Sequence, residues 1–203
     1  MQTEQSSTTA SPPQTDIAVS WKNGVYADLW TSTAFNKHRD FDKEIDVTLG
    51  KTGKLGKFDY VVDAAYFLIV IKDVIDINGE LSREFKIGPR LNLAPFIRGE
   101  RYFPTQKGGP RAGKMSIGGM RGQVQLASRV KLAFRGWLKK DTGCFGFDPA
   151  TLGQGYVGLS FNVTDKWTLL PGVTFSKPFT NVSVHDGRKS EANWEFTTSY
   201  RFR

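Results

Sequence analysis

The strongest constraint on the fold of this chain is a period of two. From Asp16 onward, apolar and polar residues alternate, and turn residues recur about every 8–14 positions. This pattern is typical of an all-β sandwich or barrel, and no segment shows the period of an amphipathic helix. Segment 123–134 shows the alternation most clearly. Its apolar face carries Val124, Leu126, Val130, Leu132 and Phe134, and its polar face carries Gln123, Gln125, Arg129 and Lys131, continued by Arg135.

The connections between the alternating segments are of two kinds. Short turns are expected at 22–24, 52–56, 88–89, 127–128 and 164–166. Longer polar or Gly/Pro-rich connections are expected at 36–42, 72–80, 104–113, 139–153 and 185–190. Because the two kinds alternate, the long loops would all lie at one end of an up-and-down meander, as in transmembrane barrels. We therefore expect one β-barrel domain over residues 16–203, preceded by a polar arm over residues 1–15.

Alternation alone does not say which face meets water, because a soluble barrel puts its apolar face inside and a membrane barrel puts it outside. Long strands of about 10–13 residues favour the membrane arrangement. So does a set of aromatic residues near strand ends, which would form girdles at the lipid interface. These residues are Trp21, Phe35, Tyr102, Trp137, Trp167, Trp194, Tyr200 and Phe202. The alternating segments number about eleven, whereas single-chain bacterial barrels have even strand numbers. The prediction is therefore an antiparallel up-and-down transmembrane β-barrel of about twelve strands, with ten as the alternative.

Two stretches in the first third of the chain also resemble a known family. They are GVYADLWTSTAF at 24–35 and EIDVTLGKTGKLGKFDYVVDAAYFL at 44–68. They are similar to a small bacterial family of conserved hypothetical proteins of the outer-membrane β-barrel type, whose members carry the patterns GFYAGLW and E-D-Y-GY-G-LGDFSYDVGYIYY. The resemblance implies a location in the bacterial outer membrane and supplies no activity. Residues 1–15 contain no apolar stretch of the kind that a secretory signal peptide needs.

The positions of the charged residues along the chain are consistent with a barrel. There are 28 Lys and Arg against 20 Asp and Glu, a net charge of +8, but no basic run marks a nucleic-acid partner. Most charges alternate with apolar residues, which would point them into the lumen, where acids and bases partly neutralise one another. The lumen-facing candidates are Glu44, Asp46, Asp59, Asp63, Glu84, Arg98, Arg129, Lys131, Arg135, Glu191 and Glu195. About twelve strands would leave a narrow, partly blocked passage.

Motifs for chemistry are scarce. Gly153, Gly155 and Gly158 spell G-x-G-x-x-G, but a strand follows where a dinucleotide site needs a helix. The two histidines, His38 and His185, lie in separate expected loops, and the single Cys144 cannot form an internal disulfide. We therefore expect no catalytic residues, no metal site and no cofactor, and no enzymatic activity.

Three functions remain open on this basis. The first is a narrow porin-like channel in the outer membrane for small polar or anionic solutes. The second is a structural or assembly barrel without conductance, and the third is a soluble lipocalin-like barrel that binds an apolar ligand. The expected partners are membrane lipid or detergent, small polar solutes, and lipopolysaccharide held by basic loop residues; the oligomeric state is left open. Those loop residues are Lys37, Arg39, Lys107, Arg111, Lys139, Lys140, Arg188 and Lys189.

Overall fold

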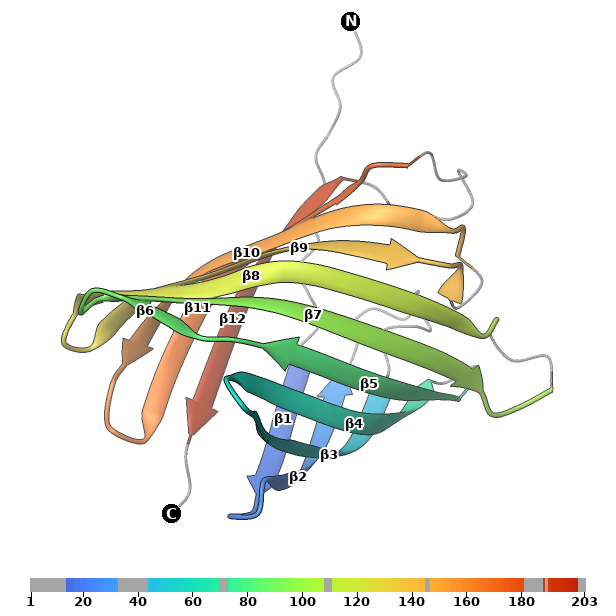
Figure 1. Cartoon of the computed structure of the whole chain (residues 1–203), viewed down its shortest axis with the longest axis horizontal. Helices are drawn as coiled ribbons and strands as arrows, with labels where there is room; N and C mark the ends of the chain where they lie inside the picture. The colour runs from blue at the N-terminus through green and yellow to red at the C-terminus, as the bar shows by residue number, and fades with distance from the viewer. Residues whose placement is uncertain are drawn as a thin grey trace, which may run out of the picture.

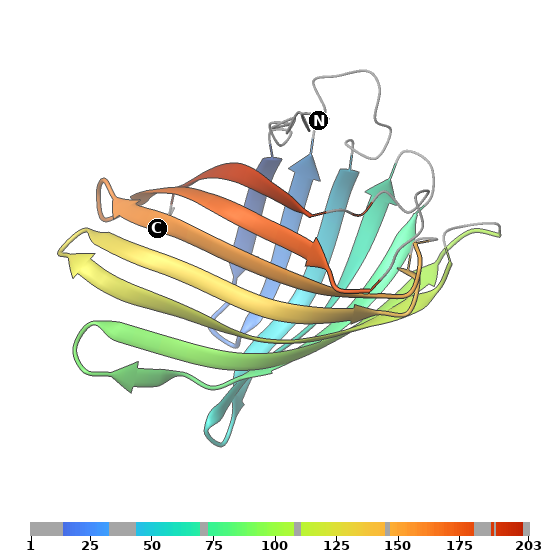
Figure 2. The same ribbon diagram turned by 90° about the horizontal axis from the view of Figure 1, so that it is seen from above.

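The computed structural model describes residues 14–32, 44–69, 73–107, 111–144, 147–180, 188 and 190–200. These residues form one antiparallel sheet of 12 strands, as predicted, which curls on itself (Figures 1 and 2). None of the described segments is a helix long and apolar enough to cross a membrane. The strands are β1 (Gln14–Ser20), β2 (Val25–Ser32), β3 (Glu44–Leu55), β4 (Phe58–Ile69), β5 (Val74–Ser82), β6 (Phe85–Ile87), β7 (Leu91–Pro104), β8 (Gly113–Ala127), β9 (Val130–Asp141), β10 (Ala150–Asn162), β11 (Trp167–Pro178) and β12 (Glu191–Tyr200).

The topology is an uninterrupted meander. Each strand pairs with the next along the chain, except that β5 and the short β6 both pair with β7. β5 and β6 therefore act as one span with a break at Arg83 and Glu84. β1 and β12 are the two edges of the sheet, and no pairing joins them among the described strands.

Short turns and long connections alternate as predicted, except that residues 70–73 alone join β4 to β5, where a long connection was expected. The turns after β1, β3, β6, β8 and β10 are short, and three of them contain a glycine with positive φ: Gly24, Gly56 and Gly88. Such left-handed positions favour glycine because it has no Cβ. The connections after β2, β7, β9 and β11 are long and lie at the opposite end of the sheet, which we call the long-loop end.

Three boundaries differ from the sequence prediction. Segment 123–134 is not one strand, because β8 ends at Ala127 and β9 begins at Val130. Most of the expected loop at 72–80 is β5, whose run of Asp76, Asn78 and Gly79 looks like a loop when read without its partners. The N-terminal arm was expected to end at residue 15, whereas β1 already begins at Gln14.

The two faces of the sheet are inverted relative to a soluble barrel. In β5, the polar side chains of Asp76, Asn78 and Glu80 are 2%, 6% and 8% exposed, while those of Ile77 and Leu81 are 48% and 39% exposed. Outward apolar residues are still more exposed on other strands, for example Ile97 at 64% and Trp194 at 71%. A polar interior and an apolar exterior are the arrangement of a transmembrane barrel, and they are the opposite of the lipocalin alternative.

Candidate functional site

The strand register places most of the predicted lumen residues on the interior face. Residues paired across neighbouring strands point to the same side of a sheet, so each residue can be traced from the buried carboxylates of β5. Glu44, Asp46, Asp59, Asp63, Arg98, Lys131, Arg135, Glu191 and Glu195 share that side. The other two lie in connections: Glu84 between β5 and β6, and Arg129 in the turn before β9, where it donates to the carbonyl of Val163 at 3.2 Å.

The predicted aromatic girdle is only partly on the outer face. Trp167 and Trp194 point outward, and Trp21 is exposed in the turn after β1. The prediction is wrong for Tyr102, which is 8% exposed inside the barrel, and for Trp137, which lies on the same side as Arg135. Phe35, Phe202 and the side chain of Tyr200 lie outside the described residues.

One wall of the interior, formed by β2 to β5, is acidic. Asp63 is held there by two side chains: the Tyr26 hydroxyl donates to Oδ2 at 2.8 Å, and the Asn78 amide donates to Oδ1 at 2.7 Å. Asp46 and Asp76 each have a buried Oδ1 with no hydrogen-bond partner among the described residues. Carboxylates therefore face the interior here with capacity to bind polar groups that no described residue supplies.

The neighbouring wall, formed by β7 to β9, carries cations. The Arg98 Nε contacts Glu100 Oε1 at 2.6 Å, and the Tyr102 hydroxyl donates to Glu100 Oε2 at 2.7 Å. Arg121 binds both Glu80, with Nη1 2.5 Å from Oε1, and the Ser82 hydroxyl, at 3.0 Å. The Arg98–Glu100 pair lies within β7, whereas the Arg121–Glu80 pair ties the basic wall to β5, at the edge of the acidic wall.

Arg135 differs from the other two arginines. Its guanidinium lies over the rings of Phe96 and Trp137, with centroid distances of 4.7 and 4.6 Å. Trp137 is fixed in turn by its indole N–H, which donates to the Gln154 amide oxygen at 2.9 Å. Arg135 forms no ion pair with a described residue, and its Nε has no hydrogen-bond partner among them. The aromatic faces hold Arg135 in one orientation, and its positive charge remains available to bind an anion.

No family model matches the sequence, and no curated protein matches it either. Among solved structures, the chain is similar to the NanC porin, with a TM-score of 0.67 and 13% identity over 93% of this chain and 92% of that one. It is also similar to the KdgM porin in complex with disordered oligogalacturonate (TM-score 0.55, 15% identity, 94% and 91% coverage) and to a bacterial polysaccharide outer membrane secretin (0.60, 12%, 94% and 69%).

The fold is shared with outer-membrane porins. With the polar interior and the alternation of short turns and long loops, this identifies the chain's architecture as a transmembrane β-barrel of twelve strands. The likeness extends to the fold alone. The resemblance to the conserved hypothetical family stays a prediction, since no comparison tests its sequence pattern.

Sequence reasoning missed several interior residues of the barrel. Asp76 and Glu80 were read as part of a loop, and Lys139 as the start of one, although all three lie on the interior face. Arg121 was not singled out, and Glu100 and Asp141 were missed as well. The signal for Glu100 was present, because it stands two residues from Arg98 on the same strand and therefore on the same face.

A loop folds onto the interior face at the long-loop end. Asp141, 2% exposed, accepts hydrogen bonds from the backbone N–H groups of Gly143 and Cys144 at 2.8 Å, and it pairs with Arg188 at 3.0 Å. Cys144 is fully buried in a cluster of interior-facing residues, Val74, Tyr102 and Met115. Burial, followed by the charge of Asp141, raises the pKa of its thiol to about 12. The segment after β9 thus narrows this end of the barrel.

The residues described contain no group of His, Cys, Asp and Glu that could hold a metal ion. Both histidines, His38 and His185, lie outside the described residues. The glycines of the G-x-G-x-x-G pattern lie within β10. Of the basic residues expected in loops, Lys37, Arg39 and Lys189 lie outside the described residues, Lys107 and Arg111 are exposed, and Arg188 is held by Asp141. Lys139 and Lys140 belong to β9, with Lys139 on the interior face and Lys140 on the outer face.

Proposed function

We propose that this chain forms a narrow channel in the bacterial outer membrane for small polar solutes, anionic ones included. The proposal rests on the separation of acidic and basic residues on two walls of the interior. An acidic wall over β2 to β5 stands beside a basic wall over β7 to β9. Asp76 and Arg135 form no ion pair with a described residue, and Asp76 Oδ1 and Arg135 Nε have no hydrogen-bond partner among the described residues. A lumen that served only as a packed core would bury such groups in complete pairs.

Two further observations support this proposal. An interior pocket of about 290 Å³ near the short-turn end is lined by Glu84, Asn92, Arg121, Gln123 and Tyr156, so it offers both signs of charge and hydrogen-bonding groups. The KdgM porin, which shares the fold, was solved with an oligogalacturonate, a solute that carries carboxylates. Arg135 would bind such a carboxylate with its free donors, while the acidic wall would accept hydrogen bonds from hydroxyl groups.

Conductance tests the proposal. The full chain, folded in detergent and inserted into planar bilayers, should give discrete conductance steps in potassium chloride. Arg135→Ala should move the reversal potential in a salt gradient toward cation preference, because it removes an uncompensated positive charge from the pore. Lys51→Ala is the matched control: Lys51 pairs with Val25 and Val62 on the outer face, so its removal should leave the reversal potential unchanged.

The same recordings also test the second candidate function, a structural barrel without conductance. The segment after β9 favours it, because Cys144 and its neighbours fill part of the interior at the long-loop end. A folded barrel that stays electrically silent, even when Arg188→Ala releases that segment from Asp141, would contradict the channel and favour the structural role.

A further inference from the structure

The outer face of the sheet carries charge of one sign. Among the described strand residues that point outward, the only charged ones are cations. One of them, Lys51, stands apart on β3. The other four lie within a few residues of the long-loop end, on β7, β8, β9 and β11, and we call them the basic belt. They are Arg101, Lys114, Lys140 and Lys177.

The basic belt has no carboxylate partner among the described residues, although the Arg101 guanidinium lies over the Phe103 ring, 5.4 Å from its centroid. Arg101 stands directly opposite Lys114 in the register of β7 and β8, which is an unfavourable pairing of like charges. None of the four residues forms an ion pair with a described carboxylate. The belt therefore presents a positive surface, without a carboxylate counterpart among the described residues, near the long-loop ends of these four strands.

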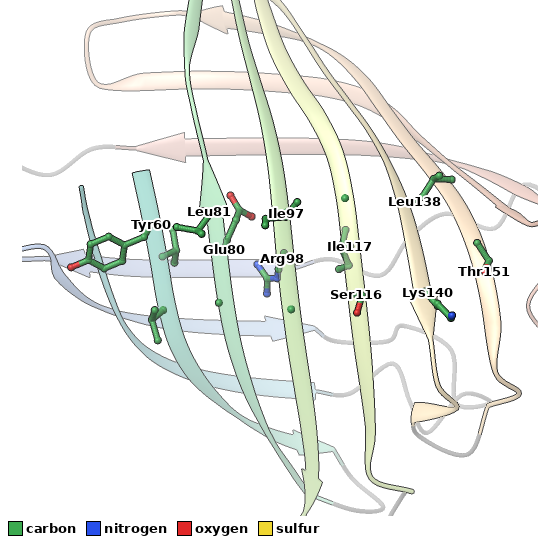
Figure 3. A pocket seen from close by; sticks show the side chains of 15 residues that line it. Tyr60, Glu80, Leu81, Ile97, Arg98, Ser116, Ile117, Leu138, Lys140 and Thr151 are labelled. Atoms are coloured by element: carbon green, nitrogen blue, oxygen red, sulfur yellow. The ribbon is translucent and has the colours of Figure 1, made fainter. Parts of the chain in front are cut away.

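Two hollows open on the same outer face, next to the belt. The first has a volume of about 810 Å³, is walled by Leu81, Ile97 and Leu138, and has Lys140 at its long-loop side (Figure 3). The second, of about 580 Å³, shares Gly118 and Leu138 with the first and has Lys177 on its lining. Each apolar hollow thus has one cation of the belt beside it.

Glycine creates the floor of these hollows. A Cβ atom placed on Gly79, Gly99 or Gly118 would meet nothing within 4 Å, so the neighbouring residues do not require glycine there. Glycine weakens a strand by leaving nothing to pack, and within strands it often marks a place where a ligand approaches the backbone closely. The hollows therefore have room for a ligand that is not part of this chain.

We propose that the outer face over β7 to β11 binds lipopolysaccharide, with the phosphates of lipid A on the basic belt and its acyl chains in the two hollows. The inference rests on the proposed location in the outer membrane. Long loops of such barrels face the cell exterior, so the belt lies at the level of the leaflet in which lipopolysaccharide resides. A second copy of this chain fits poorly, because a two-fold contact would bring cations against cations with no outward acid to receive them.

Binding can be measured on the full chain folded in detergent, with fluorescent hexa-acylated lipid A as the probe and phosphatidylglycerol as the comparison lipid. The charge variant is Lys140→Gln with Lys177→Gln, which leaves the apolar surface intact. The filling variant is Gly99→Leu with Gly118→Leu, which occupies the hollows and leaves the charge intact. The control is Lys51→Gln together with Lys166→Gln, which removes two lysines far from the belt.

The charge variant should lose about thirtyfold in affinity for lipid A, the filling variant at least about tenfold, and the control less than about twofold. Equal losses in the control and charge variants would overturn the proposal, as would equal affinity for phosphatidylglycerol. A lipid-free dimer that the filling variant abolishes would assign the face to a second copy. Conductance recorded on the same variants separates the two proposals, because loss of lipid binding should leave the conductance steps in place.

Discussion

The two faces of this sheet treat positive charge in opposite ways. Inside, Arg98 and Arg121 each reach a carboxylate within 2.6 Å, and Arg121 also binds a hydroxyl. Outside, the basic belt meets no described carboxylate at all. The difference shows that the charges of Arg98 and Arg121 are part of the structure of the barrel, unlike that of Arg135 beside them, whereas the outward charges require a counterion from the surroundings. Substitutions on the two faces should therefore have different consequences.

The largest effect is expected from a charge in the middle of the outer face. Ile97 lies halfway along β7 and is 64% exposed, so Ile97→Arg should destabilise the barrel in lipid vesicles by about 2–4 kcal/mol. Leu126→Arg is the control, because Leu126 is outward but one residue from the end of β8, where the cost falls to about 0–1 kcal/mol. Urea unfolding measures both. Equal costs at the two depths would mean that the outer face does not contact a bilayer.

A smaller effect is expected from removing one interior cation. Arg121→Met breaks the bonds to Glu80 and Ser82 and leaves the Glu80 carboxylate, 8% exposed, without its partner. The expected loss is about 1–3 kcal/mol, at the lower end if lumen water reaches the site. Arg101→Met, on the outer face, should change stability by less than about 0.5 kcal/mol. An equal loss of unfolding free energy in the two variants, measured by urea unfolding, would contradict this difference between the two faces.

These contrasts separate the features of the barrel that can be predicted from the sequence from those that cannot. The fold follows from local features, since alternation and turn spacing suffice for an up-and-down barrel. The number twelve came from the even strand numbers of bacterial barrels, and the twelfth strand is the short β6, which shares one span with β5. The side of the sheet to which a residue points also follows from the sequence once its strand is recognised. Tyr102 and Trp137 share parity with Arg98 and Arg135, and that parity places them inside the barrel. Strand recognition failed in β5, because Asp76, Asn78 and Glu80 resemble a loop until their partners are known. The partner of Glu80 is Arg121, 41 residues away, and only the folded sheet brings the two together.

The last contrast concerns glycines on the two faces, and the smallest effect belongs to the outer one. Gly99 points outward into open space, so Gly99→Ala should stabilise the barrel by roughly 0.5–1 kcal/mol by restricting the unfolded chain. Gly158 points inward, where a Cβ would collide with the Tyr156 hydroxyl and lie 2.9 Å from the Pro171 carbonyl oxygen. Gly158→Ala should therefore destabilise by about 1–3 kcal/mol. Opposite signs in one unfolding assay would support the comparison, and a common sign would contradict it.

The count of spans has a consequence for the two ends of the domain. Because β5 and β6 form a single span, the path from β1 to β12 crosses the sheet an odd number of times. β1 starts beside the long loops and β12 finishes beside the short turns, so both run in the same direction. In an outer membrane, the first residue of β1 and the last residue of β12 would therefore lie on opposite sides of the bilayer. A label at Gln14 would be reached from the cell surface, and a label at Tyr200 only from the periplasm.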